Sequence, residues 1–193
     1  MPTLLSVNLG RATTLAGVGA TGIGKLPVAG SVEVRAPGPK GAGGSGLVGD
    51  DVVDRRHHGG NDQAVYAYAR EDLDIWAAEL DRDLPAGSFG ENLTTSGIDI
   101  TNSLVGDRWQ IGDQVVLEVS CPRVPCRTFA TKLGIRHWVK AFTAKAVPGT
   151  YLRVISPGTI KAGDTVQVLS RPDHDVTVEL SFRALTTDRD LLP

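Results

Sequence analysis

The sequence VGDRWQIGDQVVLEVSCPRVPC, residues 105–126, carries the strongest fold signal in this chain. Gly106-Asp107 and Gly112-Asp113 are turn-forming pairs, and they bracket a predicted short strand at 108–111. A longer apolar run follows at 114–121 and ends at a proline. Short apolar runs between tight turns are typical of β-barrels and β-sandwiches, so this stretch predicts a β-rich domain.

The run at 114–121 has apolar residues at every second position from Val115 to Cys121. This alternation predicts a strand with one buried face, and it puts Cys121 in the core, where a free cysteine acts as a small hydrophobe. Other apolar runs bounded by Gly, Pro or Asp predict strands at 4–8, 31–35, 64–68, 108–111, 151–155 and 165–169.

Helical periodicity is limited to a few segments. Apolar side chains recur at intervals of three and four in residues 71–80 and 135–146, and Pro148-Gly149 ends the second segment. Near the end of the chain, segments 179–185 and 188–192 predict one or two short helices. The predicted fold class is therefore mostly β, with a few covering helices.

The composition is that of one globular domain, with at most a short appendage. The 193 residues are 41% hydrophobic and 22% charged, and a chain of this length can fold without a disulfide or a structural metal. A net charge of -2 argues against a nucleic-acid-binding protein, which usually has a basic excess. We find neither a signal peptide nor an apolar run long enough for a membrane span, so we expect a cytoplasmic protein with reduced cysteines. The one low-complexity stretch, PGPKGAGGSG at 37–46, predicts a flexible loop and lacks the residue order of a phosphate-binding P-loop.

Cys126 differs from Cys121 in its surroundings. It follows Pro122-Arg123-Val124-Pro125, and two prolines predict an extended backbone outside the strand ladder. Arg123 and Arg127 flank the thiol, and nearby positive charge favours the thiolate, the form that acts as nucleophile or metal ligand. A Cys121–Cys126 disulfide is disfavoured in a reducing compartment, and a zinc site needs more Cys or His ligands at suitable spacing.

Two glycine-containing segments are candidates for ligand contact. The sequence DRRHHGGND contains His57 and His58, and adjacent residues of an extended backbone point in opposite directions, so only one of them can face a pocket. The sequence GSFGENLTT forms a turn that presents Glu91 and Asn92. These two residues are either loop anchors or functional groups.

Six motifs follow one another along the chain. They are TGIGKLPV (21–28), GLVGD (46–50), HGGNDQAVYAY (58–68), GSFGENLTTSG (87–97), VGDRWQIGDQVVLEVSCPRVPC (105–126) and GTYLRVISPGTIKAGD (149–164). In this order they resemble the MOSC family, and within it the YiiM-like subgroup, over nearly the whole chain. The segments HGG, FGENL and PR-x-PC are the most specific. The resemblance implies a MOSC-type β-barrel that binds the molybdenum cofactor (molybdopterin).

The resemblance also implies roles for individual residues. Cys126 matches the cysteine of PR-x-PC that ligates molybdenum, a role that suits a soft thiolate, and His58 is the second catalytic candidate. Because the pterin cofactor carries a phosphate, cationic and backbone N–H donors are expected around it. The residues expected to bind the cofactor are Lys25, His58, Gly59, Glu91, Asn92, Arg123 and Arg153.

The family's chemistry implies reduction of N-hydroxylated compounds, such as hydroxylaminopurine, to amines. An external redox protein would supply the electrons, because the chain has neither the cysteine spacing of a cluster site nor a dinucleotide fingerprint. The alternatives are a non-catalytic carrier of molybdenum cofactor or of sulfur, as a Cys126 persulfide, and a sensing module without a cofactor. The expected partners are a small N-hydroxylated substrate and the electron donor, with neither nucleic acid nor membrane; a homodimer is compatible with this interpretation.

The expected boundaries are 1–178 for the MOSC β-barrel domain and 179–193 for a short C-terminal helical tail. YiiM-type proteins typically continue into a longer C-terminal helical segment. The resemblance therefore identifies the tail as a remnant of that segment. If the longer segment recruits the electron donor or closes the pocket, this chain would bind the cofactor with reduced activity.

Overall fold

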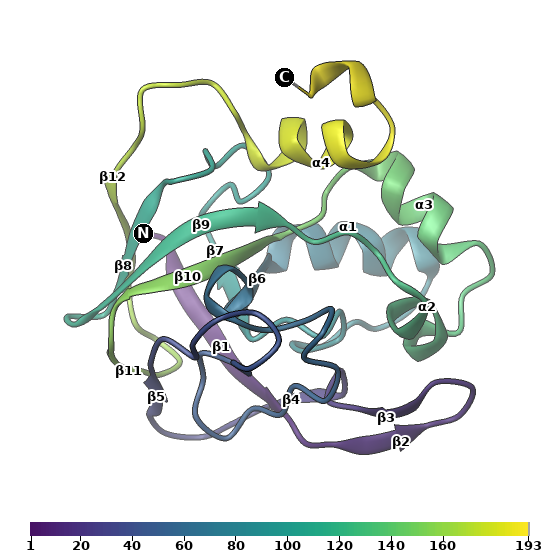
Figure 1. Cartoon of the computed structure of the whole chain (residues 1–193), viewed down its shortest axis with the longest axis horizontal. Helices are drawn as coiled ribbons and strands as arrows, with labels where there is room; N and C mark the ends of the chain where they lie inside the picture. The colour runs from purple at the N-terminus through teal and green to yellow at the C-terminus, as the bar shows by residue number, and fades with distance from the viewer. Residues whose placement is uncertain (193) are drawn as a thin grey trace.

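The computed structural model describes residues 1–192, in which strands outnumber helices (Figure 1). The strands are β1 Thr3–Gly10, β2 Thr13–Leu15, β3 Gly19–Thr21, β4 Lys25–Pro27, β5 Val32–Val34, β6 Val65–Ala69, β7 Leu93–Ser96, β8 Arg108–Ile111, β9 Val115–Pro122, β10 Thr150–Ser156, β11 Gly158–Ile160 and β12 Val166–Ser170. The helices are α1 Arg70–Leu80, α2 Arg127–Leu133, α3 Trp138–Lys145 and α4 Val178–Thr186, with single turns η1 Asn61–Gln63 and η2 Arg189–Leu191. The predicted mostly β class is confirmed, and each expected strand is present with small shifts at its ends.

Eight strands form one curved sheet in the order β12-β8-β9-β10-β6-β7-β1-β4. All neighbours in it are antiparallel except β6 and β7, which are parallel. The sheet curves until Thr3 of β1 bridges Thr165, and Val166 N–H donates to the carbonyl of Pro2 at 2.9 Å. The expected closed barrel is therefore corrected to an open, curved sheet, because an isolated bridge rather than a strand ladder links β1 to β12.

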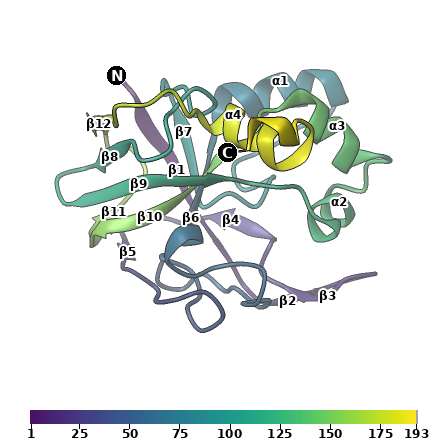
Figure 2. The ribbon, with the colours of Figure 1, turned by 45° about the horizontal axis from the view of Figure 1, so that its top comes forward.

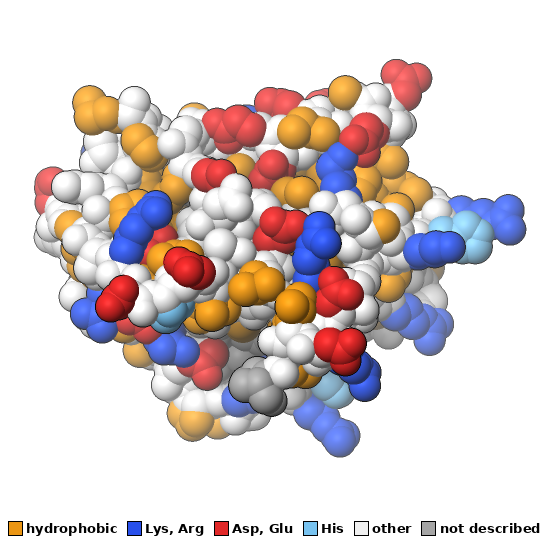
Figure 3. Space-filling view, turned by 90° about the horizontal axis from the view of Figure 1, so that it is seen from above, with side chains coloured by type: hydrophobic (Ala, Val, Ile, Leu, Met, Phe, Trp, Pro, Cys, Tyr) orange, Lys and Arg blue, Asp and Glu red, His pale blue; other side chains and the backbone are white. Residues whose placement is uncertain are grey.

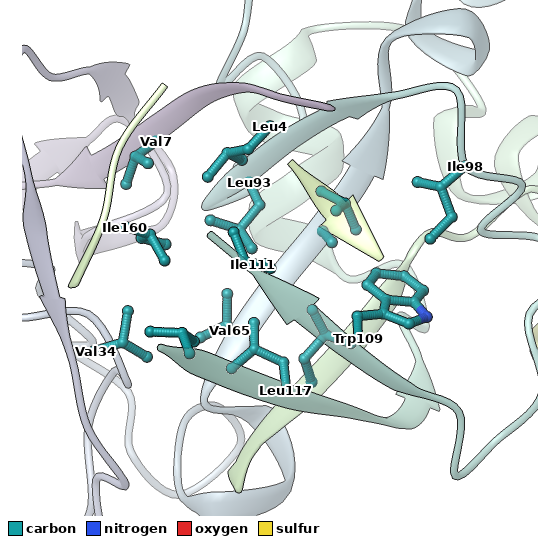
Figure 4. Packing of buried hydrophobic residues seen from close by; sticks show 14 of the residues in the cluster. Leu4, Val7, Val34, Val65, Leu93, Ile98, Trp109, Ile111, Leu117 and Ile160 are labelled. Carbon is teal, nitrogen blue, oxygen red and sulfur yellow. The ribbon is translucent and has the colours of Figure 1, made fainter. Parts of the chain in front are cut away.

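The concave side of the sheet encloses the main apolar core. Val115, Leu117 and Val119 of β9 are buried there, as their alternation predicts. Figure 4 shows side chains from β1, β5, β6, β7, β8 and β11 turned towards the same centre. These strands are far apart in the sequence, and their packing in one core stabilises the curved shape of the sheet. The curved sheet in turn brings together the loops that form the pocket.

A second core is mostly aromatic and fills the space between β6 and the helices, which gather on one side of the sheet (Figure 2). Phe89 lies at its centre, with five ring neighbours at centroid distances of 5.0–6.3 Å. Such pairs each contribute about 0.5–1.5 kcal/mol beyond burial. The rings are Tyr66, Tyr68, Trp76, Phe89, Phe129, Trp138, Phe142 and Phe182. Phe129 belongs to α2, so this cluster fixes the helix that follows Cys126.

The helices predicted at 71–80 and 135–146 are α1 and α3, but α3 begins only at Trp138. The sequence did not predict α2, because its seven residues are too few to show a helical period. The predicted short helices of the tail are α4 and η2, and Phe182 of α4 is fully buried in the aromatic cluster. None of the helices among residues 1–192 has the length and apolar character needed to cross a bilayer.

We expect Phe142→Ala to lower the free energy of unfolding by about 3–5 kcal/mol, because it removes a fully buried ring from the aromatic cluster. Val139→Ala on the same helix is the control, since Val139 is 40% exposed and should cost under about 1 kcal/mol. Urea denaturation followed by tryptophan fluorescence measures both. Equal losses in the two variants would contradict a packed aromatic core.

Candidate functional site

A pocket of about 330 Å³ lies where five segments of the chain meet. Its walls are formed by the β2–β3 hairpin with the turn after it, residues 50–54, the HGG segment, the turn before β7 and the connection from β9 to α2. Six of the predicted site residues line it: Lys25, His58, Gly59, Asn92, Arg123 and Cys126. The pocket also contains the aromatic side chains Tyr66 and Tyr151, whose ring centroids are 5.1 Å apart.

Cys126 reaches the pocket because of the prolines before it. Strand β9 ends at Pro122, and the backbone stays extended up to Cys126 (φ −127°, ψ 171°) before α2 begins at Arg127. Phe129, one turn into α2, anchors this helix in the aromatic cluster. The thiol is therefore half-buried at a fixed position in the pocket wall.

The surroundings of Cys126 favour its thiolate. Burial acts to raise the thiol pKa, but a hydrogen bond with His58, the backbone amide of Phe129 and the positive charge of Arg123 outweigh it and lower the pKa to about 6. Since the ordinary value lies well above neutrality, Cys126 is mostly ionised near pH 7. A half-buried thiolate beside a histidine can act as a nucleophile or as a soft metal ligand.

Cys121 does not lie in the apolar core, contrary to the sequence prediction. Tyr151 of β10 pairs with Cys121, whereas Leu152 pairs with Val119, so one extra residue of β9 is inserted as a bulge at Ser120. The bulge reverses the alternation, and Cys121 is only half-buried, with Sγ 3.8 Å from the carbonyl of Asp62. Burial raises the pKa of the Cys121 thiol, whereas the pKa of Cys126 is lowered. Cys121 is therefore less ionised than Cys126 at neutral pH.

The two histidines diverge, although residues 55–57 form a turn and not the extended backbone on which that expectation depended. His58 lines the pocket, while His57 is exposed and its Nδ1 lies 2.9 Å from Asp54 Oδ2. Gly59 and Gly60 both have positive φ. A Cβ at Gly59 would lie 2.6 Å from the carbonyl oxygen of Gly44, and one at Gly60 would lie 2.8 Å from Lys40 Cα. The glycines therefore allow the glycine-rich loop to pack against the histidine segment, a role that the sequence did not predict.

Glu91 lies behind the pocket wall and Asn92 in it. The fully buried Glu91 carboxylate accepts hydrogen bonds from the N–H groups of Gly87 and Phe89 and from Thr94 Oγ1, so it holds the turn together. Burial raises the pKa of Glu91, and these hydrogen bonds partly offset that effect. Asn92 lines the pocket and ties it to β6, because its Oδ1 accepts from the N–H of Tyr66 at 3.1 Å.

The three predicted cations have different environments. Lys25 forms a buried ion pair with Asp50, and burial lowers its pKa. Arg123 is buried under the pocket, where it donates to the carbonyl of Phe89. Its Cζ lies 4.1 Å from the Phe129 ring centroid and 4.8 Å from that of Tyr66. Arg153 does not line the pocket; it pairs with Glu118 at 2.8 Å and with Asp62 at 2.9 Å.

The structure adds residues that the sequence did not indicate. Asp50 accepts from Lys25, from the N–H of Gly10 and from Asn92 Nδ2, so it connects three segments of the pocket. Lys132 of α2 donates to the carbonyls of Ile23 and Gly87, and burial lowers its pKa to about 8. Asp50 is the last residue of the motif GLVGD, which could have drawn attention to it, whereas none of the six motifs contains Lys132.

The family model of the MOSC domain matches residues 54–167, which is more than half of the chain and includes His58, Asn92, Arg123 and Cys126. The chain belongs to the MOSC domain family. This family is associated with binding of the molybdenum cofactor. Twelve of the twenty-three residues that line the pocket of this MOSC protein fall within the matched region.

Several relatives match the MOSC protein over much of its length. The uncharacterized protein YflK of Bacillus subtilis is 34% identical over 183 residues, 93% of this chain and 79% of YflK. YiiM of Escherichia coli is 34% identical over 137 residues, 69% of this chain and 60% of YiiM. A Gibberella moniliformis protein named "Reductase" is 35% identical over 138 residues, 70% of this chain but only 24% of the fungal protein.

Solved structures agree with the sequence relatives. YiiM from Geobacillus stearothermophilus superimposes with a TM-score of 0.78 at 27% identity, covering 98% of this chain and 86% of that one. YiiM from Escherichia coli gives a TM-score of 0.71 at 26% identity, covering 95% and 77% respectively. The predicted YiiM-like resemblance is confirmed.

We expect Cys126 to be alkylated by iodoacetamide with a pH midpoint near its pKa of about 6, whereas Cys121, whose pKa is raised, should react only in alkaline solution. The ratio of the two rates should therefore be largest at about pH 6 and below and should fall as the pH rises, and His58→Ala should shift the Cys126 midpoint upwards. Peptide mass spectrometry after timed alkylation measures both sites in one sample. Parallel titration of the two thiols would contradict the proposed environment of Cys126.

Gly59→Ala should destabilise the protein and slow alkylation of Cys126, because the new Cβ clashes with the backbone of Gly44 and displaces His58. Gly41→Ala is a matched control, since Gly41 also has positive φ but has open space around its Cα. The control isolates backbone strain, which costs about 1–3 kcal/mol. Thermal melts and the alkylation rate of Cys126 measure the difference between Gly59→Ala and Gly41→Ala. Identical behaviour of the two variants would contradict the packing role of Gly59.

Proposed function

We propose that this MOSC protein binds the molybdenum cofactor with Cys126 as the protein ligand of the metal. The observation that carries the proposal is a thiolate with a pKa of about 6 in the wall of a pocket that is partly lined by aromatic side chains. Soft thiolates suit such metals. Within residues 1–192 no group of three or more His, Cys, Asp or Glu side chains can hold a metal ion, so the residues fit a metal that brings further ligands from its own cofactor.

The pocket also offers donors for the anionic part of such a cofactor. Arg123 has no carboxylate partner among the described residues, and His58 and the amide of Asn92 lie in the same wall. Lys25 is less suited to bind a phosphate, because Asp50 already neutralises its charge. We therefore assign the cofactor's anionic group to Arg123 and His58, with Lys25 and Asp50 as a structural pair.

We propose that the reaction is reduction of an N-hydroxylated compound to an amine. The balanced change is R–NH–OH with two electrons and two protons giving R–NH₂ and water. When bound, the cofactor supplies two-electron redox chemistry. The chain orients the substrate against the rings of Tyr66 and Tyr151, and a ring nitrogen of His58 delivers a proton to the departing hydroxyl oxygen. Among residues 1–192 the two cysteines are not grouped with histidines or carboxylates as the ligands of a cluster would be, so we assign the electron supply to a separate protein.

The test is metal analysis of protein from a host that makes the molybdenum cofactor. We expect about one molybdenum per chain in wild type and in Cys121→Ser, and loss of the metal in Cys126→Ser, because only Cys126 is a thiolate that faces the pocket. Reduction of hydroxylaminopurine with dithionite should follow the metal content. Circular dichroism shows that each variant is folded.

Two outcomes would overturn the proposal in different ways. Retention of molybdenum in Cys126→Ser would remove Cys126 as the ligand. Folded wild type without molybdenum, with one added sulfur atom on Cys126 in mass spectrometry, would support a persulfide carrier instead.

A further inference from the structure

Charge is unevenly distributed along this chain. Residues 119–163 contain eight of its twenty Lys and Arg and none of its twenty-two Asp and Glu. The rest of the chain therefore has twelve basic against twenty-two acidic residues, which makes it strongly acidic. The basic segment begins in β9 and includes Cys126, α2, α3 and β10.

Several of these cations have partners inside the protein. Arg123 and Lys132 donate to backbone carbonyls, Lys145 pairs with Glu79, and Arg153 pairs with Glu118. Arg127, Arg136 and Lys140 are exposed, and none of them forms an ion pair with a carboxylate of residues 1–192. Arg127 donates to the carbonyl of Gly17 at 3.0 Å, which leaves its charge without a carboxylate partner. We call these three residues, with the exposed His137, the basic face.

The basic face lies on α2, α3 and the turn between them. Figure 3 shows blue and pale blue side chains gathered at the right-hand edge of the molecule, where Figure 1 places that turn. Asp81 and Asp83 mark one border, because Arg82 between them donates to the carbonyl of Leu133 at 2.7 Å. Acidic residues therefore lie beside the end of α2, and Lys145 at the end of α3 pairs with Glu79.

The basic face adjoins the pocket. Arg127 directly follows Cys126, and Thr128 of the same turn lines the pocket wall. Helix α2 has seven residues, so it spans roughly 10 Å at 1.5 Å per residue. A protein partner that covers about 800 Å² on this side would extend over both the basic face and the rim of the pocket.

We propose that the basic face is the docking surface for an acidic electron-transfer protein that carries a flavin or an iron–sulfur cluster. The inference rests on the proposed function, which consumes two electrons per substrate and needs a protein to deliver them. Opposite charge speeds the encounter and orients the partner, while interfaces of electron-transfer proteins are often small. Docking here brings the donor's redox group close to the thiol wall of the pocket.

The size of the face favours a protein over other polyanions. Membrane-binding clusters usually contain four to eight Lys or Arg, and DNA-binding proteins make about six to ten phosphate contacts. The three Lys and Arg residues of the basic face are too few to bind a membrane or DNA. The rest of the chain is acidic and would repel such an extended polyanion. A compact acidic patch on a folded protein matches this face.

The experiment compares two double variants with the same change in charge. Arg136→Glu/Lys140→Glu reverses the basic face, and Arg35→Glu/Lys161→Glu reverses two exposed, unpaired cations near the β5–β11 sheet. The probes are a purified acidic flavodoxin and an acidic plant-type ferredoxin, titrated against the cofactor-loaded protein at low and high salt. We expect the first variant to weaken binding at low salt by about tenfold or more and the control by under about twofold, with the difference lost at high salt.

A second readout separates this inference from the proposed function. With dithionite as reductant the face variant should turn over like wild type, while its KM for the protein donor should rise about tenfold. Absence of turnover in every protein would remove the reductase proposal and leave the binding comparison intact. Equal weakening in both variants, no binding of either probe, or tighter binding to duplex DNA or phosphatidylserine vesicles would overturn the docking surface.

Discussion

The buried guanidinium of Arg123 is the constraint on which the pocket depends. It donates to the carbonyl of Phe89 and lies against the rings of Tyr66 and Phe129, so one side chain joins the turn before β7, strand β6 and helix α2. A buried charge without a carboxylate costs several kcal/mol unless other groups compensate it. Cation–π contacts of about 2 kcal/mol each when desolvated offset part of this cost. The thiolate of Cys126 supplies the remaining opposite charge, which is why Arg123 and the low thiol pKa belong together.

Much of the fold can be predicted from the sequence, because alternation and turn residues are local signals. The strand at 114–121 and its buried residues Val115, Leu117 and Val119 illustrate this. The same alternation gave the wrong environment for Cys121, since a bulge opposite β10 depends on the partner strand and leaves no mark in β9 itself. The curvature of the open sheet likewise brings residues 3 and 165 together, a contact that no local pattern encodes.

The site shows the same division. Cys126 and His58 occur in motifs whose glycines and prolines dictate the local backbone, and both line the pocket. The partners of Lys25 and Arg153 depend on contacts between segments far apart in the chain, and these contacts decide which cation faces a ligand. Lys25 forms an ion pair with Asp50, and Arg153 forms one with Glu118. A list of basic residues therefore cannot separate ligand-binding cations from structural ones.

The charge balance of the pocket follows from these pairings rather than from its composition. Asp50, Asp51 and Asp54 all line the pocket, which by composition alone would repel an anion. Each is already engaged: Asp50 by Lys25, Asp51 by the N–H of Ala12 at 2.9 Å, and Asp54 by His57. Arg123 has no such carboxylate partner among the described residues, so its charge acts on the thiolate and on whatever enters the pocket. The aspartates thus hold the loops in place, while His58, the amide of Phe129 and the buried arginine together favour the thiolate.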